Sequence, residues 1–300
     1  MGSECGAARD LGGGRGSLTL RRRATHMPNL KLLAPRILVA IVLAAPSLAH
    51  DVATSWNSTK NTVDDTIYGD NKVSFYCGCD YSSLGNASGS GTVDMGECGM
   101  EALPLYAGDA DEIQYEHIVP SSLMPARQMA CYLKPERFAA CVTSSGNVKD
   151  GRDCCEDIDG ATAQLMMFDL HNLAPSIGQV NQYRGNDRYG EIDDEDDHRE
   201  TWVGCAAEHV REAHVLEHRF EPADCTKGDV ARIWMYMAQQ HGLAIPDDEW
   251  AMFQRWSDDD PVSPWEPERD RRIGDEQGNR NPFVEGVTPE ASGACDWEPQ

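Results

Sequence analysis

The chain has 300 residues, of which 40% are hydrophobic and 25% charged, so it can bury a sizeable core and is neither wholly disordered nor collagen-like. Its formal net charge of −24 excludes a generally basic nucleic-acid coat but leaves a local basic cleft open. No apolar run reaches the roughly 18–20 residues of a membrane-spanning helix, which argues against an integral membrane protein.

The N-terminal region has the pattern of a secretory signal peptide. A short apolar run, Ile37–Ala45, follows two basic residues and ends in Ser47-Leu48-Ala49, which places small residues where a signal peptidase cleaves. We therefore predict a signal peptide over residues 27–49, preceded by an extra N-terminal segment, residues 1–26. A buried core helix is the alternative, and it fits the flanking residues less well.

The predicted mature chain is strongly acidic and rich in cysteine. Removal of residues 1–49 leaves 19 basic and 48 acidic residues, a net charge of −29, together with ten cysteines. An even number of cysteines behind a signal peptide predicts a disulfide framework formed in an oxidising compartment. A zinc site at Cys77-Gly-Cys79 is the alternative, although this spacing is one residue shorter than the usual metal-binding turn. The adjacent Cys154 and Cys155 should have separate partners.

Helix and strand patterns alternate in the first part of the mature chain. Amphipathic spacing predicts a helix over Thr59–Ile67, and alternation of apolar with polar residues predicts a strand over Lys72–Cys77. A loop rich in Gly, Ser and Asn covers 84–92. A further short strand, over Glu112–Val119, is closed by a proline.

The second part of the chain is more helical. Pro175 suits the first turn of a helix that runs through Val180, and apolar residues at helical spacing predict a helix over Val230–Gln240. No internal repeat is visible, so we predict one mature domain over residues 50–285. An exposed acidic insertion at 193–197 and a loose C-terminal tail, residues 286–300, complete the chain.

Two short segments combine chemically competent side chains with apolar surroundings: Tyr115–Pro120 and Asp169–Pro175. The carboxylate of Glu116 and the amide oxygen of Asn172 are hard ligands of the kind that Mg²⁺ prefers. A neutral imidazole such as that of His117 can take a proton from water near neutral pH. Together these groups indicate metal-assisted phosphodiester hydrolysis, but spacing alone leaves open that His117 and His171 are structural core histidines.

Several longer motifs, taken in order, resemble the endonuclease I family of periplasmic and secreted bacterial nucleases. They span roughly residues 55–285 and are Phe75–Asp80, Glu116–Pro120, Asp169–Pro175, Val180-Asn181, Arg184–Asn186, Lys227–Arg232, Asp260–Arg269 and Gln277–Pro282. The resemblance implies an α+β fold, disulfide-stapled in this chain. It also implies a ββα-metal finger, in which a hairpin and a helix surround one Mg²⁺.

The family's functional residues transfer onto matching positions of this chain. The resemblance implies that Glu116 and Asn172 are the metal ligands and that His117 is the general base. The family's transition-state arginine precedes a cysteine in a Gly-Arg context, which matches Arg152, with Arg127 and Arg137 as rivals. Because neighbouring residues on a regular strand face opposite ways, Glu116 and His117 should lie where the strand ends.

Rival signals point to other chemistry. His214-Val-Leu-Glu217-His218 matches a zinc-peptidase pattern, which functions only on a helix that places both histidines on one face. The acidic run at 193–197 lacks the spaced ligands and glycine of a calcium-binding loop, so a solvated loop is the better interpretation.

Because the acidic chain must bind a polyanion, we expect a basic cleft formed by Arg184, Arg188, Arg269, Arg271, Arg272 and Arg280.

The function that follows is a secreted or periplasmic endonuclease with little sequence preference. We expect it to be a monomer without membrane contact that cleaves DNA, and RNA as well, leaving 5′-phosphate ends. The expected cofactor is Mg²⁺, with Mn²⁺ or Ca²⁺ as substitutes. The alternative is an acidic secreted binding protein that keeps the fold without catalysis.

Overall fold

The computed structural model describes residues 52–53, 55–85, 90–104, 108–124, 129–193, 199–202, 204–210 and 218–297. Every element below belongs to one compact unit, Pro46–Gln300. The predicted signal peptide and the segment before it lie outside the described residues, as do most of the acidic insertion and residues 214–217 of the zinc-like motif. Helices and strands are both present, which confirms the α+β class. No described helix is long and apolar enough to cross a membrane.

The first of two sheets in the described chain is antiparallel throughout, in the order β1-β2-β3-β4. Its strands are β1 (Tyr81–Ser83), β2 (Gly91–Val93), β3 (Glu112–His117) and β4 (Leu173–Ile177). In the central pair, Glu116 lies opposite Ala174 and His117 opposite Leu173. Ile113 and Tyr115 alternate into the core, but Glu116 is buried as well, so the alternation ends at the chemically important residues.

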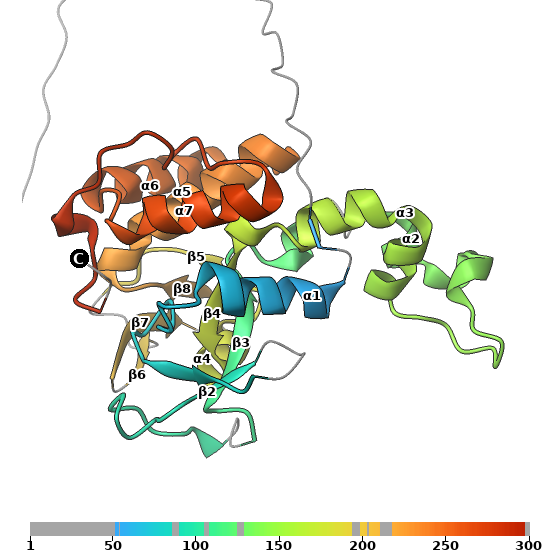
Figure 1. The fold of residues 1–300 in the computed structure, drawn as a ribbon, viewed down its shortest axis with the longest axis horizontal. Coiled ribbons are helices and arrows are strands. Elements are labelled where there is room, and N and C mark those ends of the chain that lie inside the picture. The colour runs from blue at the N-terminus through green and yellow to red at the C-terminus, as the bar shows by residue number, and fades with distance from the viewer. Residues whose placement is uncertain are drawn as a thin grey trace, which may run out of the picture. The chain divides into compact units, whose positions relative to one another are not determined.

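The helix α4 (Gly178–Arg184) follows β4 directly, and β3, β4 and α4 together form the ββα finger. The connection between β3 and β4 contains the helices η3 (Ser121–Leu123), α2 (Ala130–Leu133), η5 (Pro135–Arg137), η6 (Ala139–Cys141), α3 (Gly151–Met167) and η7 (Leu170–Asn172). Residues 129–158 of this connection, which we call the arm, project away from the other elements (Figure 1).

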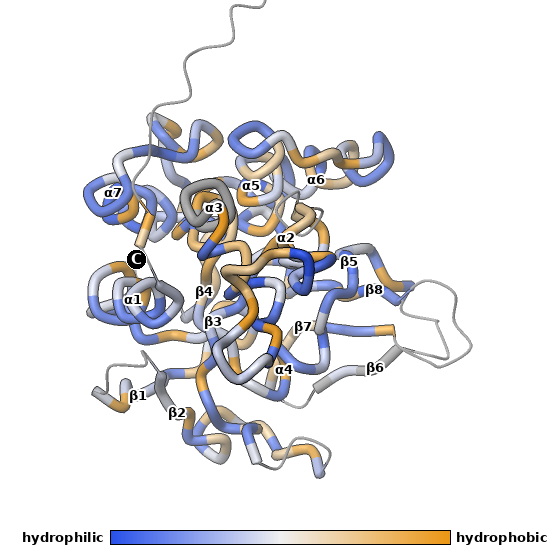
Figure 2. Tube along the Cα trace, turned by 90° about the vertical axis from the view of Figure 1, so that its right-hand side faces the viewer, coloured by the Kyte–Doolittle hydropathy of each residue, from blue (hydrophilic) through white to orange (hydrophobic). Residues whose placement is uncertain are grey.

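The second sheet has the order β5-β8-β7-β6, in which β5 and β8 are parallel. Its strands are β5 (Arg188–Tyr189), β6 (Arg199–Trp202), β7 (Cys205–Val210) and β8 (Arg219–Glu221). The helices α5 (Asp224–His241), α6 (Asp247–Asp259) and α7 (Trp265–Gln277) lie together on one side of the sheets. Much of α5 is buried, whereas α7 is largely hydrophilic (Figure 2). The remaining helices are α1 (Trp56–Asn61), its π-helical continuation η1 (Thr62–Ile67) and η8 (Ala291–Gly293).

Several predicted elements are confirmed. The helix over Thr59–Ile67 is α1 with η1, the strand from Glu112 is β3, and the helix over Val230–Gln240 is the C-terminal part of α5. This last helix ends at Gly242, whose φ of 68° lies in the left-handed region that glycine adopts easily.

Two predicted elements are wrong. The segment 72–77 is not a strand: Val73 forms only an isolated bridge with Asp80, and Phe75 donates its N–H to the carbonyl of Pro175. Pro175 itself lies in β4, and the helix begins three residues later at Gly178. A proline is tolerated there because β4 is an edge strand of its sheet, where the donor that proline lacks can be spared.

All ten cysteines of the predicted mature chain form disulfides, which confirms the framework and excludes a zinc site at Cys77 and Cys79. The pairs are Cys77–Cys205, Cys79–Cys98, Cys131–Cys155, Cys141–Cys154 and Cys225–Cys295. Cys154 and Cys155 do have separate partners. The two disulfides within the arm form a small apolar cluster of their own with Met129, Tyr132 and Phe138.

The C-terminal tail is fastened to the domain over its described part, not loose. Cys295 is joined to Cys225 in α5, and the N–H of Glu290 donates to the carbonyl of Val262 at 2.8 Å. The Trp297 ring packs so closely on Gly78 that a Cβ there would lie 2.1 Å from it. The tail therefore covers part of the turn between Cys77 and Cys79.

Candidate functional site

Glu116 is a buried carboxylate near the end of β3. Its side chain is 3% exposed, and its Oε1 accepts hydrogen bonds from Arg184 and, at 3.5 Å, from the Tyr76 hydroxyl. Burial raises the pKa of Glu116 to about 7, because loss of hydration disfavours the charged carboxylate more than the Arg184 ion pair favours it. No described residue donates to the other carboxylate oxygen, Oε2, so the structure leaves one oxygen of a buried carboxylate for a further partner.

Arg184 joins the helix of the finger, α4, to the end of its first strand, β3. It is the last residue of α4 and 1% exposed, and besides Glu116 it donates to the carbonyls of His117 at 3.0 Å and Ile118 at 2.8 Å. Its guanidinium lies 4.7 Å from the centre of the Tyr189 ring. A buried arginine with several hydrogen bonds of this kind holds the end of β3 against α4, because a guanidinium has five donors in fixed geometry.

His117 ends β3 and faces away from Glu116. Its Nε2–H donates to the carbonyl of Met167 at 2.7 Å, and because a carbonyl can only accept, the proton must be on Nε2. Nδ1 is then unprotonated and accepts no hydrogen bond from the described residues. Burial lowers the pKa of His117 to about 4, and the neighbouring Arg152 and Arg184 charges act in the same direction. The imidazole is therefore neutral at pH 7, with a lone pair on Nδ1.

Asn172 lies just before β4, fully buried, beside the end of β3. Its Oδ1 accepts the N–H of Val119 at 2.7 Å, and its Nδ2 donates to the carbonyl of Val119 at 3.1 Å. This pair of bonds fixes which end of the amide is oxygen. The oxygen keeps a second lone pair, since an amide oxygen has two.

A buried polar network supports the turn that carries Asn172. Asp169 caps η7 by accepting the His171 N–H at 3.0 Å, and its carboxylate also accepts from Tyr236, His241 and Gln277 at 2.7–2.9 Å. Burial alone would raise the pKa of Asp169, but these hydrogen bonds and the nearby histidines hold it below its ordinary value. Asp169 therefore stays ionised and joins η7 to α5 and α7.

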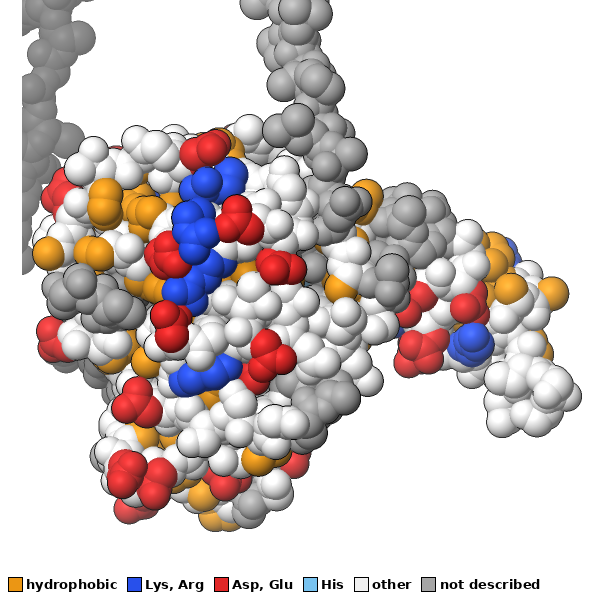
Figure 3. Space-filling view, viewed as in Figure 1, with side chains coloured by type: hydrophobic (Ala, Val, Ile, Leu, Met, Phe, Trp, Pro, Cys, Tyr) orange, Lys and Arg blue, Asp and Glu red, His pale blue; other side chains and the backbone are white. Residues whose placement is uncertain are grey.

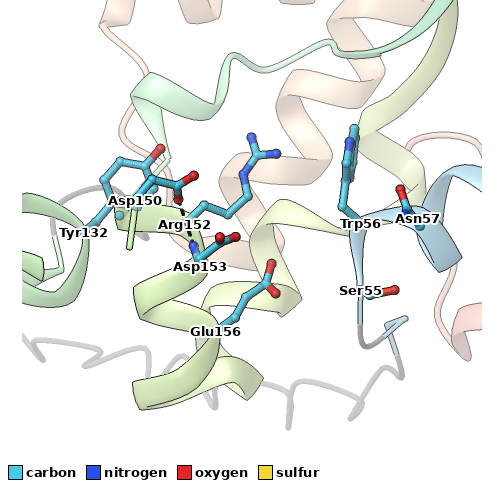
Figure 4. A pocket seen from close by; sticks show the side chains of 9 residues that line it. Ser55, Trp56, Asn57, Tyr132, Asp150, Arg152, Asp153 and Glu156 are labelled. Carbon is cyan, nitrogen blue, oxygen red and sulfur yellow. Dashed lines mark hydrogen bonds between the residues drawn. The ribbon is translucent and has the colours of Figure 1, made fainter. Parts of the chain in front are cut away.

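Arg152 occupies the second position of α3, beside a cavity of about 580 Å³. Its guanidinium lies 5.5 Å from the centre of the Trp56 ring, and its side chain extends between those of Tyr132 and Trp56 (Figure 4). The cavity is lined by Ser55, Trp56, Asn57, Tyr132, Asp150, Gly151, Arg152, Asp153 and Glu156. Arg137 is exposed on η5, and Arg127 lies outside the described residues.

The predicted basic cleft is wrong, because its six arginines are engaged elsewhere. Figure 3 shows the pattern on one face, where Lys and Arg side chains are bordered by Asp and Glu. Arg184 pairs with Glu116, Arg188 with Glu249, Arg271 with Glu268 and Asp275, Arg272 with Glu268 and Asp70, and Arg280 with Asp270; Arg269 donates to the carbonyls of Leu170, His171 and Leu173.

The site is suited to one hard divalent cation that keeps most of its water. Among the described residues there is no cluster of three or more His, Cys, Asp and Glu side chains able to hold a metal. A magnesium site needs fewer protein ligands, because Mg²⁺ sheds water reluctantly and binds through one or two oxygen donors. The free oxygen of Glu116 and the oriented Oδ1 of Asn172, on neighbouring strand ends, are donors of that kind.

Sequence patterns did not identify two side chains that organise this site. Trp56 stacks on the His117 ring with centroids 5.2 Å apart and an interplanar angle of 12°, although it is 61 positions away in the chain. Arg184 was expected at the surface and is instead the internal brace of Glu116. Its signal in the sequence was the Arg184–Asn186 motif of the family resemblance, which did not indicate this role.

Comparison with known proteins finds a family model and several curated relatives. The model described as Endonuclease I matches residues 51–288. An extracellular deoxyribonuclease of Aeromonas hydrophila is 30% identical over 223 residues, which cover 73% of this chain and 84% of that protein. A periplasmic deoxyribonuclease of the same species is 29% identical over 254 residues, 82% of this chain and 92% of that protein. An extracellular ribonuclease of Bacillus amyloliquefaciens is 31% identical over 135 residues, 39% of this chain and 43% of that protein.

Proposed function

This chain belongs to the endonuclease I family, and we propose that it cleaves DNA and RNA with one bound Mg²⁺ and leaves 5′-phosphate ends. It is a nuclease of the secreted or periplasmic kind, in agreement with its five disulfides. One observation carries the proposal. A neutral imidazole, His117, with its Nδ1 unprotonated, ends the strand on which Glu116 offers a free carboxylate oxygen, and Asn172 lies on the adjoining strand end.

In the proposed reaction, Nδ1 of His117 takes a proton from a water molecule as the water oxygen forms a bond to phosphorus. The bond between phosphorus and the 3′ oxygen breaks on the opposite side, and the leaving oxygen is protonated by solvent. The incoming oxygen stays on the 5′-phosphate. Glu116 and Asn172 would hold the Mg²⁺ ion, whose positive charge would stabilise the transition state. Met167 keeps the imidazole in the tautomer that can accept at Nδ1.

The first test is digestion of supercoiled plasmid and of an unstructured RNA, each with Mg²⁺ and with a chelator. We expect cleavage of both substrates with Mg²⁺ and none with chelator, and ends that a ligase accepts directly because they carry 5′-phosphate. Binding of DNA without cleavage under any metal condition would favour the alternative, a secreted binding protein that keeps the fold.

Replacement of Glu116 by alanine tests the metal ligand. We expect the Mg²⁺ concentration for half-maximal rate to rise, since one of two protein ligands is removed, and high Mg²⁺ to restore part of the rate. The truncation also strands the buried Arg184, so thermal melting must be measured in parallel. Glu116→Gln keeps the shape and an oxygen donor and serves as the matched variant. An unchanged Mg²⁺ dependence in both folded variants would exclude Glu116 as a ligand.

The arginine that stabilises the transition state is assigned to Arg152. Its side chain lines the cavity beside Trp56, which contacts His117. In the described chain Arg152 forms no ion pair, and Glu156 in the same cavity interacts with its charge at longer range. Arg152→Ala should therefore lower kcat more than it raises KM, by about 10²-fold or more if one preorganised donor is removed. Arg127→Ala is the decisive companion. If Arg127→Ala lowers kcat and Arg152→Ala does not, the assignment passes to Arg127.

Substrate binding by so acidic a protein needs cations that are not already neutralised. In the part of the chain that the structure describes, Lys60, Lys134, Arg137 and Arg152 form no ion pair, and they belong to α1 and the arm. We place the phosphate backbone along these elements. Lys134→Ala with Arg137→Ala should raise KM and reduce the slope of log affinity against log salt by about 1 for each phosphate that is no longer neutralised. Arg255→Ala with Arg271→Ala, which removes two exposed arginines already paired with acidic residues, is the charge-matched control.

A further inference from the structure

Trp56 holds a fixed position at the start of α1. Ser55 caps this helix: its hydroxyl oxygen accepts the Ser58 N–H at 3.2 Å, and its carbonyl accepts both the N–H and the hydroxyl of Thr59. The indole then lies nearly parallel to the imidazole of His117 and contacts Phe168, with ring centroids 6.0 Å apart. The capped helix start therefore delivers a large flat ring to one face of the catalytic imidazole.

The hydrogen bond to Met167 cannot orient that imidazole alone. Nε2 lies close to the extended line of the Cβ–Cγ bond, so one N–H···O bond at Nε2 restrains rotation of the ring about Cβ–Cγ only weakly, and this rotation would swing Nδ1 away from its target. A flat indole stacked on the imidazole face prevents this rotation. The two contacts together define one ring orientation, with Nδ1 as the only ring nitrogen left for chemistry.

We propose that Trp56 is a positioning residue that holds the imidazole of His117 in the orientation in which Nδ1 can accept a proton from water. The proposal rests on the function proposed above and adds a residue to it. The same indole contacts the Arg152 guanidinium, so one side chain contacts both the base and this arginine. Loss of the indole frees both groups, and misplacement of reacting groups by about 1 Å can cost 10²-fold in rate.

A purely structural role for Trp56 predicts a different result. The indole is only partly buried and packs against the main core. If its role is purely structural, its truncation should lower the stability of the protein without a specific loss of kcat. Trp250 in α6 provides the matched control, because it is also partly buried and also packs against that core, but on an element that contributes no side chain to the site. If Trp56 positions His117, Trp56→Ala should lower kcat and Trp250→Ala should not. If Trp56 is only structural, the two variants should have similar kcat.

The experiment compares Trp56→Ala, Trp56→Phe and Trp250→Ala with the wild-type protein at a temperature where all are folded. We expect Trp56→Ala to lose about 10- to 100-fold in kcat with KM nearly unchanged, Trp56→Phe to keep most of the rate because it retains a flat ring, and Trp250→Ala to match the wild type. Wild-type kcat in Trp56→Ala, or an equal loss in Trp250→Ala, would overturn the proposal.

A second readout does not depend on turnover. In nuclear magnetic resonance spectra of the wild type, the ring current of the stacked indole should shift the ring protons of His117. Trp56→Phe should keep part of this shift, and Trp56→Ala should lose it. The nitrogen shifts of His117 should report the Nε2–H form throughout. An unshifted His117 ring in the wild type would refute the stack. Absence of cleavage by a wild type with the shifted ring would instead refute the proposed function.

Discussion

Replacement of His117 by alanine is expected to lower kcat by about 10²–10⁴-fold while the Mg²⁺ dependence of the rate stays close to that of the wild type. The reason is geometric, because His117 and Glu116 are neighbours on β3 whose side chains leave the strand in different directions. Glu116 is joined to Arg184 and Tyr76, whereas His117 is joined to Met167 and Trp56. Removal of the imidazole thus takes away a proton acceptor without touching a proposed ligand.

The measurement is a steady-state rate over a range of Mg²⁺ concentrations, combined with added imidazole. Free imidazole should restore part of the rate of His117→Ala, since the cavity left by the side chain can admit the missing base. His218→Ala is the control, because that histidine lies 3.6 Å from Asp187 and apart from the finger. Near-wild-type kcat in His117→Ala would remove His117 from the mechanism.

Reduction of the disulfides is expected to abolish nearly all activity, and reoxidation to restore it. Removal of each native disulfide from a secreted domain typically costs about 2–5 kcal/mol, against a total stability of about 5–15 kcal/mol. The effect should also be local. The arm disulfides fasten α2 and η6 to the first turns of α3, and the last carbonyl of α3, from Met167, holds His117.

Paired serine variants separate the local effect from general destabilisation. Cys131→Ser with Cys155→Ser should lower kcat even at low temperature, because α3 loses the support of α2. Cys225→Ser with Cys295→Ser, which releases only the tail, should lower the melting temperature but leave kcat near that of the wild type at low temperature. Equal kcat in the oxidised protein and in the arm variant would show that the arm disulfides contribute stability alone.

Local sequence patterns predicted the elements whose form is decided locally. The stripe of apolar residues in α5 suffices, because this helix packs its apolar residues against the core. The predicted helix at Pro175 was wrong for a physical reason. The fixed φ of proline suits an edge strand as well as a first helical turn, and only the pairing of β4 with β3 decides between them. Helix α3 was missed because its sequence carries cysteines and acids where an apolar stripe would be expected.

The candidate site likewise contains some residues that local patterns predicted and others whose roles depend on distant contacts. Glu116, His117 and Asn172 lie in two short motifs, and pairing of β3 with β4 brings those motifs together. The partners that orient them come from distant segments: Trp56 from α1, Arg184 from α4, and Tyr236 from α5 by way of Asp169. No local pattern encodes such pairings. The arginines assigned to a basic cleft show the same limit, since their acidic partners are set by tertiary packing.

The long interruption of the finger has a consequence for the order of folding. β3 ends at His117 and β4 begins at Leu173, so 55 residues must be looped out before the two strands pair. The free-energy cost of a longer loop grows only slowly, by about 0.6 kcal/mol per doubling, but distant pairings form late because local contacts form first. The arm, closed by disulfides spanning 24 and 13 residues, can form by itself beforehand. A newly exported chain should therefore carry every side chain of the proposed mechanism while it is still inert, and become a nuclease only when its two strand ends meet.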